Sequence, residues 1–343
     1  MSRKLLILAA VFSAFGSTVC LGQEGSKDAP ADKDSATAVS DTKNTLPQVP
    51  SIRKQTIALI ELRKKFEINP KKVLPREQNV AIVEKLQAYA RDENDPASRY
   101  AALHEAGMYA ALCGDSKFAR SVIKQTLASY EMDRLPFIAE VLQATDTIRQ
   151  SSDERLHWAR WAEQIGDEAL TEERVYFARE FYRLAAMVSR TVSDKTQYNA
   201  QRQKREEANR LMPEYERAQV SLAALESNPD DPAMNERWGA YLCFTRGKWE
   251  MGVPFLAKAE NELIRTAAQA ELNQAAGKPE PHKIAELWSQ VAESHNDVAI
   301  KGPAIESARY WLRKAVESAS DSEKAKLQKQ LGRLPEATAQ ARK

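Results

Sequence analysis

The side chains that most often hold metals or perform catalysis are few and scattered in this chain. Its four histidines are His104, His157, His282 and His295. A zinc site needs several converging histidine, cysteine or carboxylate ligands, and no second histidine follows His104 four residues later. The sequence also lacks a glycine-rich phosphate loop and the GxSxG, HExxH and CxxCH motifs. We therefore expect no catalytic residue, no metal site and no bound cofactor.

Charged runs in the sequence point to helix surfaces. The acidic pairs Asp153-Glu154 and Glu172-Glu173 are expected at helix starts, where carboxylates interact favourably with the helix dipole. The basic run at 202–205 is followed directly by Glu206 and Glu207, which is typical of a solvated helix. The net charge of the whole chain is only +2. We therefore expect no nucleic-acid partner.

Aromatic residues are dense between positions 158 and 182. Most of these rings are expected in the core, because aromatic side chains dominate packing between helices. One or two of them could instead line an exposed groove, as helical-repeat proteins present such grooves to peptides. The candidate partner-binding residues are Trp158, Trp161, Tyr176 and Phe181.

The elements that would position these residues are helical hairpins, of which residues 228–260 give the clearest example. Asp231 can cap a helix and Pro232 suits its first position. An apolar face follows from Met234 to Leu242, and Gly247 suits the left-handed residue after the helix. A second helix is expected to place Trp249, Val253, Leu256, Ala259 and Leu263 on one face, with a kink or late start at Pro254.

A spacing of small, large and small residues recurs in the second helices of such hairpins. The four sets are Ala119–Ile123–Thr126, Ala178–Tyr182–Ala185, Gly252–Leu256–Ala259 and Ala308–Leu312–Ala315. This pattern resembles the tetratricopeptide repeat (TPR), although the units recur at longer intervals than that repeat. We predict an all-α fold of antiparallel helical hairpins, stacked as a TPR-like solenoid or an irregular helical repeat.

Longer strings are similar to a tetratricopeptide-like helical module of exported planctomycete bacterial proteins. The strings lie at 95–115, 130–142, 228–259 and 307–331. This resemblance covers roughly residues 50–333 and supplies no catalytic residue. It implies a tetratricopeptide-like helical module. Because the family's modules often precede carbohydrate-binding or lectin-like domains, it also raises a link to carbohydrate.

The first residues predict an export signal. Two basic residues precede an apolar run from Leu5 to Phe15, which is too short to span a bilayer comfortably. Gly22 offers a small residue for cleavage before Gln23. We expect a periplasmic or secreted protein. A lipid anchor at Cys20 and an uncleaved membrane anchor remain alternatives.

The chain is expected to contain one large helical domain. The predicted organisation is a signal peptide at 1–22, a disordered tether at 23–49, a helical domain at 50–335 with possible halves 50–192 and 194–335, and a frayed tail at 336–343. Export would permit a disulfide between Cys113 and Cys243, but both lie on predicted apolar faces where a buried thiol also fits.

These features favour an exported, non-enzymatic scaffold or adaptor that binds another protein in the cell envelope. Two alternatives remain open. One is a carbohydrate or cell-wall binder, and the other is an enzyme with an unfamiliar helical active site, which would need clustered carboxylates with perturbed pKa values.

Overall fold

The computed structural model describes residues 46–69, 72, 74–145, 151–192, 195–274 and 280–335. In this part of the chain the regular elements are helices and no strand is present, so the predicted all-α fold is confirmed. The predicted signal peptide with Cys20, Gly22 and Gln23 lies outside the described residues, as does the predicted tail.

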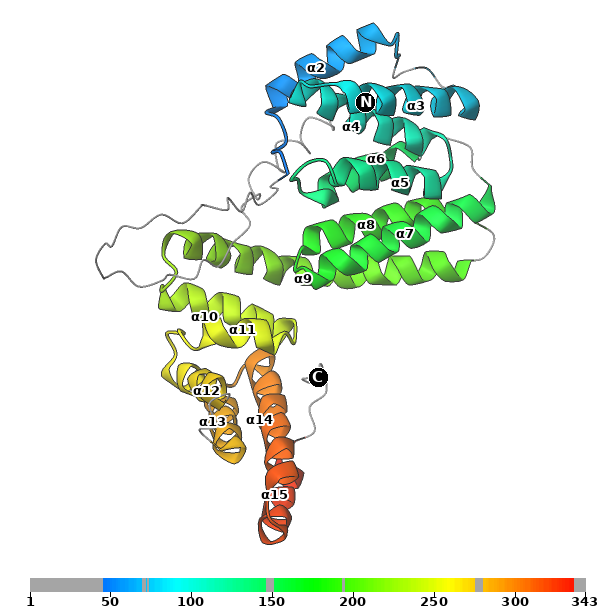
Figure 1. Ribbon diagram of the computed structural model, residues 1–343. Coiled ribbons are helices and arrows are strands. Elements are labelled where there is room, and N and C mark those ends of the chain that lie inside the picture. Colours follow the sequence, from blue (N-terminus) through cyan, green and yellow to red (C-terminus); the bar gives the residue numbers. More distant parts are fainter. Residues whose placement is uncertain are drawn as a thin grey trace, which may run out of the picture. The chain divides into compact units, whose positions relative to one another are not determined.

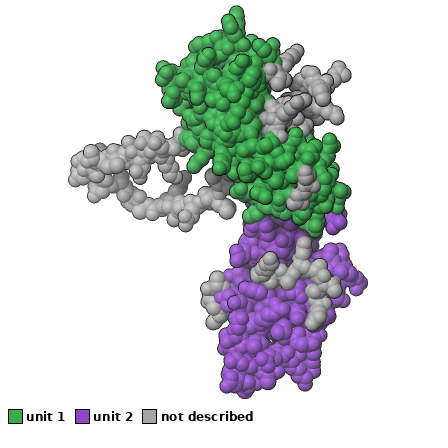
Figure 2. All heavy atoms as spheres, turned by 90° about the vertical axis from the view of Figure 1, so that its right-hand side faces the viewer, with its two compact units in different colours: residues 1–209 green, residues 210–343 purple. Residues whose placement is uncertain are grey.

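The chain divides into two compact units, with the boundary between Asn209 and Arg210 (Figure 2). This boundary falls inside a single helix, α9 (Lys195–Ser227), and not near residue 193 as expected. Pro213 lies within α9. Helix α9 continues through Pro213 and does not divide into two helices there. A proline removes only one backbone N–H donor, so the turns on either side can still form.

The first unit is built from α2 to α8 and the first part of α9. The helices before α9 are α2 (Ile52–Lys65), α3 (Arg76–Asp92), α4 (Pro96–Leu112), α5 (Ser116–Leu127), α6 (Arg134–Ala144), α7 (Ser152–Thr171) and α8 (Val175–Ser189). Helix α4 packs against α2, α3, α5 and α6, and α7 forms a hairpin with α8. Figure 1 shows α2, α3 and α4 followed by the α5–α6 pair and then by the α7–α8 hairpin.

Aspartate caps set the helix starts in the first unit. The carboxylate of Asp95 accepts a hydrogen bond from Ser98 N at 2.8 Å, and that of Asp115 accepts one from Phe118 N at 3.0 Å. Each cap satisfies a backbone donor that the first turn leaves open. Gly114, between α4 and α5, has φ +71°, a conformation that favours glycine. The capping aspartates and the glycine thus form the expected hairpin of α4 and α5.

The chain before α2 is also attached to the first unit. The backbone N–H of Glu131 donates to Pro47 O at 3.0 Å, and Gln48 hydrogen-bonds the Glu131 carboxylate. The folded body therefore includes residues 46–49, which the sequence assigned to the end of the tether.

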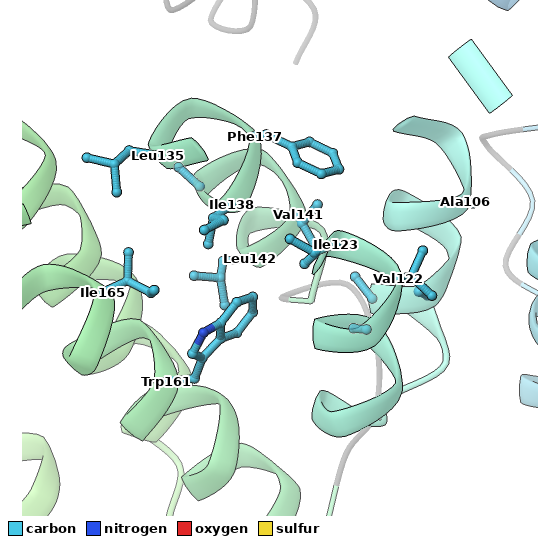
Figure 3. Close-up of a cluster of buried hydrophobic side chains, with 14 of the residues drawn as sticks. Ala106, Val122, Ile123, Leu135, Phe137, Ile138, Val141, Leu142, Trp161 and Ile165 are labelled. Atoms are coloured by element: carbon cyan, nitrogen blue, oxygen red, sulfur yellow. The ribbon is translucent and has the colours of Figure 1, made fainter. Parts of the chain in front are cut away.

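The core of the first unit lies between its helix layers. Figure 3 shows Trp161 and Ile165 of α7 directed toward Ile138 and Leu142 of α6. All four side chains are buried. Close packing of these apolar side chains is what keeps neighbouring hairpins in register.

The second unit continues the pattern of helices packed in succession. They are α10 (Pro232–Ala240), the π-helical turn η2 (Tyr241–Thr245), α11 (Trp249–Leu256), α12 (Glu262–Asn273), α13 (Pro281–Ser294), α14 (Val298–Ser318) and α15 (Asp321–Arg333). Each of these helices from α10 onward packs against the next. The hairpin predicted at 228–260 is present, but Asn261 caps a new helix, so Leu263 lies in α12 and is exposed.

All twelve members of the small–large–small sets are buried. Two of the large residues approach the glycine of the preceding helix: Tyr182 lies against Gly166, and Leu256 lies against Gly239. Small residues at these crossings allow the two helices of a hairpin to approach closely. The small–large–small spacing therefore correctly predicts contacts between helices in both units.

Candidate partner-binding site

A cavity of about 330 Å³ lies within the second unit, among residues of α9, α10, η2 and α14. Its floor includes the buried residues Ala218, Tyr241 and Phe244. Two residues from the start of α14, Ala299 and Ile300, complete the apolar lining. Apolar concavities of this size can accept a side chain or a small ligand.

The π-helical turn explains how the floor is formed. Arg246 N donates to Tyr241 O at 3.0 Å, five residues back along the chain, and Lys248 N donates to Leu242 O at 2.8 Å. The wider turn leaves the four consecutive residues from Tyr241 to Phe244 all buried. π-turns are rare and occur frequently at functional sites.

The rim of the cavity carries charge. Arg217 forms an ion pair with Glu214 and donates from Nε to Pro213 O at 3.2 Å. Arg237 is exposed, and its side chain makes no hydrogen bond or ion pair within the described part of the chain. An apolar floor beside an unpaired arginine suits an apolar side chain followed by a carboxylate.

The four predicted partner-binding aromatics lie in the first unit, and three of them are buried. Trp158 and Phe181 are completely inaccessible, and Trp161 is 6% exposed. These three rings lie in the core, where most of this aromatic group was expected, because neighbouring helices cover them. Tyr176 is only half-buried, with the Arg179 guanidinium 5.0 Å from its ring centroid. Its partner-binding role stays a prediction.

A polar cluster crosses α2, α4 and α6. Arg63 forms a bidentate pair with Glu105, at 2.8 Å from Nε and 2.9 Å from Nη2, although the Glu105 side chain is only 1% exposed. The hydrogen bond to Glu105 raises the pKa of Arg63 against the opposing effect of burial. His104, the residue directly before Glu105 in α4, has its Nε2 3.1 Å from Glu140 Oε2 of α6.

The pKa values of His104 and Glu140 are shifted in opposite directions by their pairing. Burial opposes the charged imidazole, but the hydrogen bond and charge of Glu140 outweigh it and raise the pKa of His104. Burial likewise opposes the Glu140 carboxylate, but its interactions with His104 lower its pKa. Paired groups with shifted pKa values occur at catalytic sites. The His104–Glu140 pair joins α4 to α6, as an ion pair with a purely structural role also would.

A second polar network holds α9 to the α7–α8 hairpin. Lys204 Nζ lies 2.8 Å from both Glu163 Oε1 and Asp167 Oδ2, and Tyr182 Oη donates to Asp167 Oδ1 at 2.8 Å. Burial and the hydrogen bond to Asp167 raise the pKa of Tyr182. Lys204, expected on a solvated face, is therefore partly engaged in packing.

The acidic pairs have different surroundings. Asp153 and Glu154 lie in the first turn of α7, as expected. Glu172 and Glu173 instead follow α7, and Glu173 has φ +56°. The expectation of a helix start there is wrong, because α8 begins only at Val175.

A second, more open cavity of about 470 Å³ lies along α13 and α14. Tyr310, Lys314 and Glu317 contribute to its lining. Beside it, Glu271 Oε2 accepts indole N–H groups from Trp288 at 3.0 Å and Trp311 at 2.9 Å. This second cavity is therefore bordered by both aromatic and polar side chains.

Cys113 and Cys243 are both buried and are not joined by a disulfide. Burial raises the pKa of Cys113 to about 11. Within the residues that the structure describes, no three His, Cys, Asp or Glu side chains gather as a metal site. A separate search of those residues finds no helix with the length and apolarity to cross a bilayer.

Comparison with protein-family models, with characterised proteins and with solved structures gave no match. The tetratricopeptide-like resemblance therefore stays a prediction. The sequence does not predict the cavity beside η2, because its lining comes from segments as far apart as Glu214 and Ile300. The one local signal was the run Tyr241–Phe244, which is more continuously apolar than one helix face requires.

Proposed function

We propose that this chain is an exported, non-enzymatic helical-repeat protein that binds another protein in the cell envelope, as a scaffold or adaptor. The observation that supports it best is the cavity beside η2, with its buried apolar floor and its exposed Arg237. The stacked hairpins support the same proposal, because helical repeats bind peptides on preformed surfaces.

The cavity suggests what the partner presents. An apolar side chain would fill the space above Tyr241 and Phe244, and an adjacent acidic residue would meet Arg237. Arginine favours such contacts because its planar guanidinium binds carboxylates in bidentate geometry. The partner is therefore a protein segment with an apolar residue beside an acidic one.

Crosslinking capture with the chain from Gln23 onward, in its own envelope fraction, tests this proposal. The variants Arg237→Glu and Ala299→Trp should each reduce a specifically captured protein about tenfold, since one reverses the rim charge and the other fills the cavity. The control variants Arg313→Glu and Ala325→Trp make the same changes at exposed positions away from it. Equal capture by all variants, or no captured protein, would count against the proposal.

A carbohydrate or cell-wall binder is the second candidate, supported by the open cavity beside α14. Tyr310 offers a ring for stacking, and Lys314 and Glu317 offer polar groups for hydroxyls. Sedimentation with insoluble peptidoglycan should then fall for Tyr310→Ala and stay unchanged for Arg237→Glu. Absence of sedimentation would remove this alternative.

A further inference from the structure

Helix α2 carries two opposite apolar stripes, only one of which is used in packing. Ala58 and Leu62 are buried against the first unit. The opposite face presents Ile57 and Ile60, which are 49% and 63% exposed. A helix that ends a soluble stack normally has a polar outer face. The outward isoleucines therefore need an explanation of their own.

Basic residues bracket the outward isoleucines. Arg53, Ile57, Ile60 and Lys64 follow each other at intervals of four, three and four residues, which places them in one stripe along the helix. Ile52, on the flank of this stripe, is also 63% exposed. The stripe is thus basic at both ends and aliphatic in the middle.

The helix is strongly basic as a whole. Its sequence IRKQTIALIELRKK contains five basic residues and a single acidic one, Glu61. Arg63 is neutralised by Glu105, and Lys65 lies 4.1 Å from the ring centroid of Tyr89. Arg53, Lys54 and Lys64 make no ion pair within the described residues. Their charges are available to an anionic partner.

We infer that this outward face of α2 binds the surface of an anionic phospholipid bilayer, with the helix lying flat and Ile57 and Ile60 inserted between headgroups. Helices that lie in a membrane interface combine aliphatic residues with lysine and arginine, whose long side chains reach out to the phosphates. Protein interfaces are instead depleted in lysine at their centres and use aromatic anchors. The outward face of α2 has no aromatic residue.

The inner face of α2 stays packed on α4 while the outer face meets the bilayer. The helix is therefore formed before it binds, and no folding cost opposes the contact. Figure 1 shows α2 at the outer edge of the first unit, with no described helix of that unit over its outward side. Binding would fix the orientation of the first unit on the membrane, which goes beyond capture of a protein partner.

Vesicle flotation with the chain from Gln23 onward tests this binding without the apolar run at 5–15. The protein should float with vesicles of phosphatidylglycerol mixed with phosphatidylcholine, and stay unbound with phosphatidylcholine alone. High salt should weaken binding, because the basic residues act through a screened surface potential. The double variants Ile57→Ser/Ile60→Ser and Arg53→Gln/Lys64→Gln should each bind about tenfold less tightly.

Matched control variants distinguish binding through the outward face of α2 from nonspecific adsorption to vesicles. Val220→Ser changes another exposed aliphatic residue, and Lys326→Gln/Lys329→Gln removes two exposed charges from α15. Both should bind like the unaltered chain. Circular dichroism checks that each variant is folded.

Three outcomes would overturn the inference. One is no flotation with anionic vesicles, and the second is equal binding to neutral vesicles. The third is a concentration-dependent dimer that Ile57→Ser/Ile60→Ser abolishes, which would show that the face is covered by a second copy of the chain.

Discussion

Gly166 of α7 lies against the ring of Tyr182 in α8, so closely that a Cβ at position 166 would come within 2.6 Å of Tyr182 Cε1. The ring cannot withdraw easily, because Tyr182 is buried and its hydroxyl is bound to Asp167 at 2.8 Å. This pair sets the distance between the two helices of the hairpin.

The first prediction follows from this contact. Gly166→Ala should destabilise the protein by about 1–3 kcal/mol, the usual cost of overpacking a core. Urea denaturation followed by far-UV circular dichroism measures it. Gly332→Ala in α15 is the control, because a Cβ there meets nothing within 4 Å, and it should be neutral or stabilise by up to about 1 kcal/mol. Equal stability of Gly166→Ala and the unaltered chain would contradict the packing described.

The second prediction concerns the Arg63–Glu105 pair. Arg63→Met should destabilise the fold by roughly 2–3 kcal/mol, because it leaves the buried Glu105 carboxylate uncompensated. This cost is at or below the lower limit usual for breaking a fully buried pair, because the Arg63 side chain is 33% exposed and solvent screens its charge.

Removing both charges tests whether the loss comes from the unpaired carboxylate. Arg63→Met/Glu105→Met should recover most of the stability in the same urea titration, since two apolar side chains leave no buried charge. A double variant as unstable as the sum of its singles would show that the two residues do not interact.

The third prediction is a pH dependence at His104. Its raised pKa means that its pairing with Glu140 stabilises the fold fully below the unfolded histidine value of about 6.5, and that this contribution is lost as pH rises through the folded pKa. The lowered pKa of Glu140 gives a contribution that is present above its unfolded value near 4.5 and is lost as pH falls through its folded pKa.

The difference in stability between the unaltered chain and His104→Gln should therefore be larger near pH 5.5 than near pH 8.5. We expect at most about 1 kcal/mol, because the Glu140 side chain is 44% exposed. NMR titration should also give His104 a pKa above the reference value near 6.5. A pKa at or below that reference value would contradict the pairing.

The fourth prediction concerns thiol reactivity. Cys113 is buried and its pKa is raised to about 11, so little reactive thiolate exists near neutral pH. A thiol-specific reagent should modify Cys113 far more slowly in the folded protein than in urea. In the chain from Gln23 onward, which lacks Cys20, the Cys243→Ala variant leaves Cys113 as the one thiol to be measured. Rapid labelling of the folded variant would show that the α4 terminus opens readily.

Local signals predicted where helices begin, and the structure confirms several of them. Asp95, Asp115 and Asp231 each accept a backbone N–H in the first turn. These caps are readable because the donor and acceptor lie within three residues of each other. The end of α11 and the start of α12 were missed, although Asn261 is itself a good capping residue. There the apolar spacing from Trp249 to Leu263 suggested one continuous helix.

The sequence by itself determined the helical class, the hairpins and the small residues at helix crossings, because periodicity and caps act over a few residues. Only the tertiary structure decided that Trp158 and Phe181 are covered while Ile57 and Ile60 are exposed. Burial depends on which distant segments pack against a residue. The cavity beside η2 has the same origin, because a concave site exists only once segments distant in the chain are brought together.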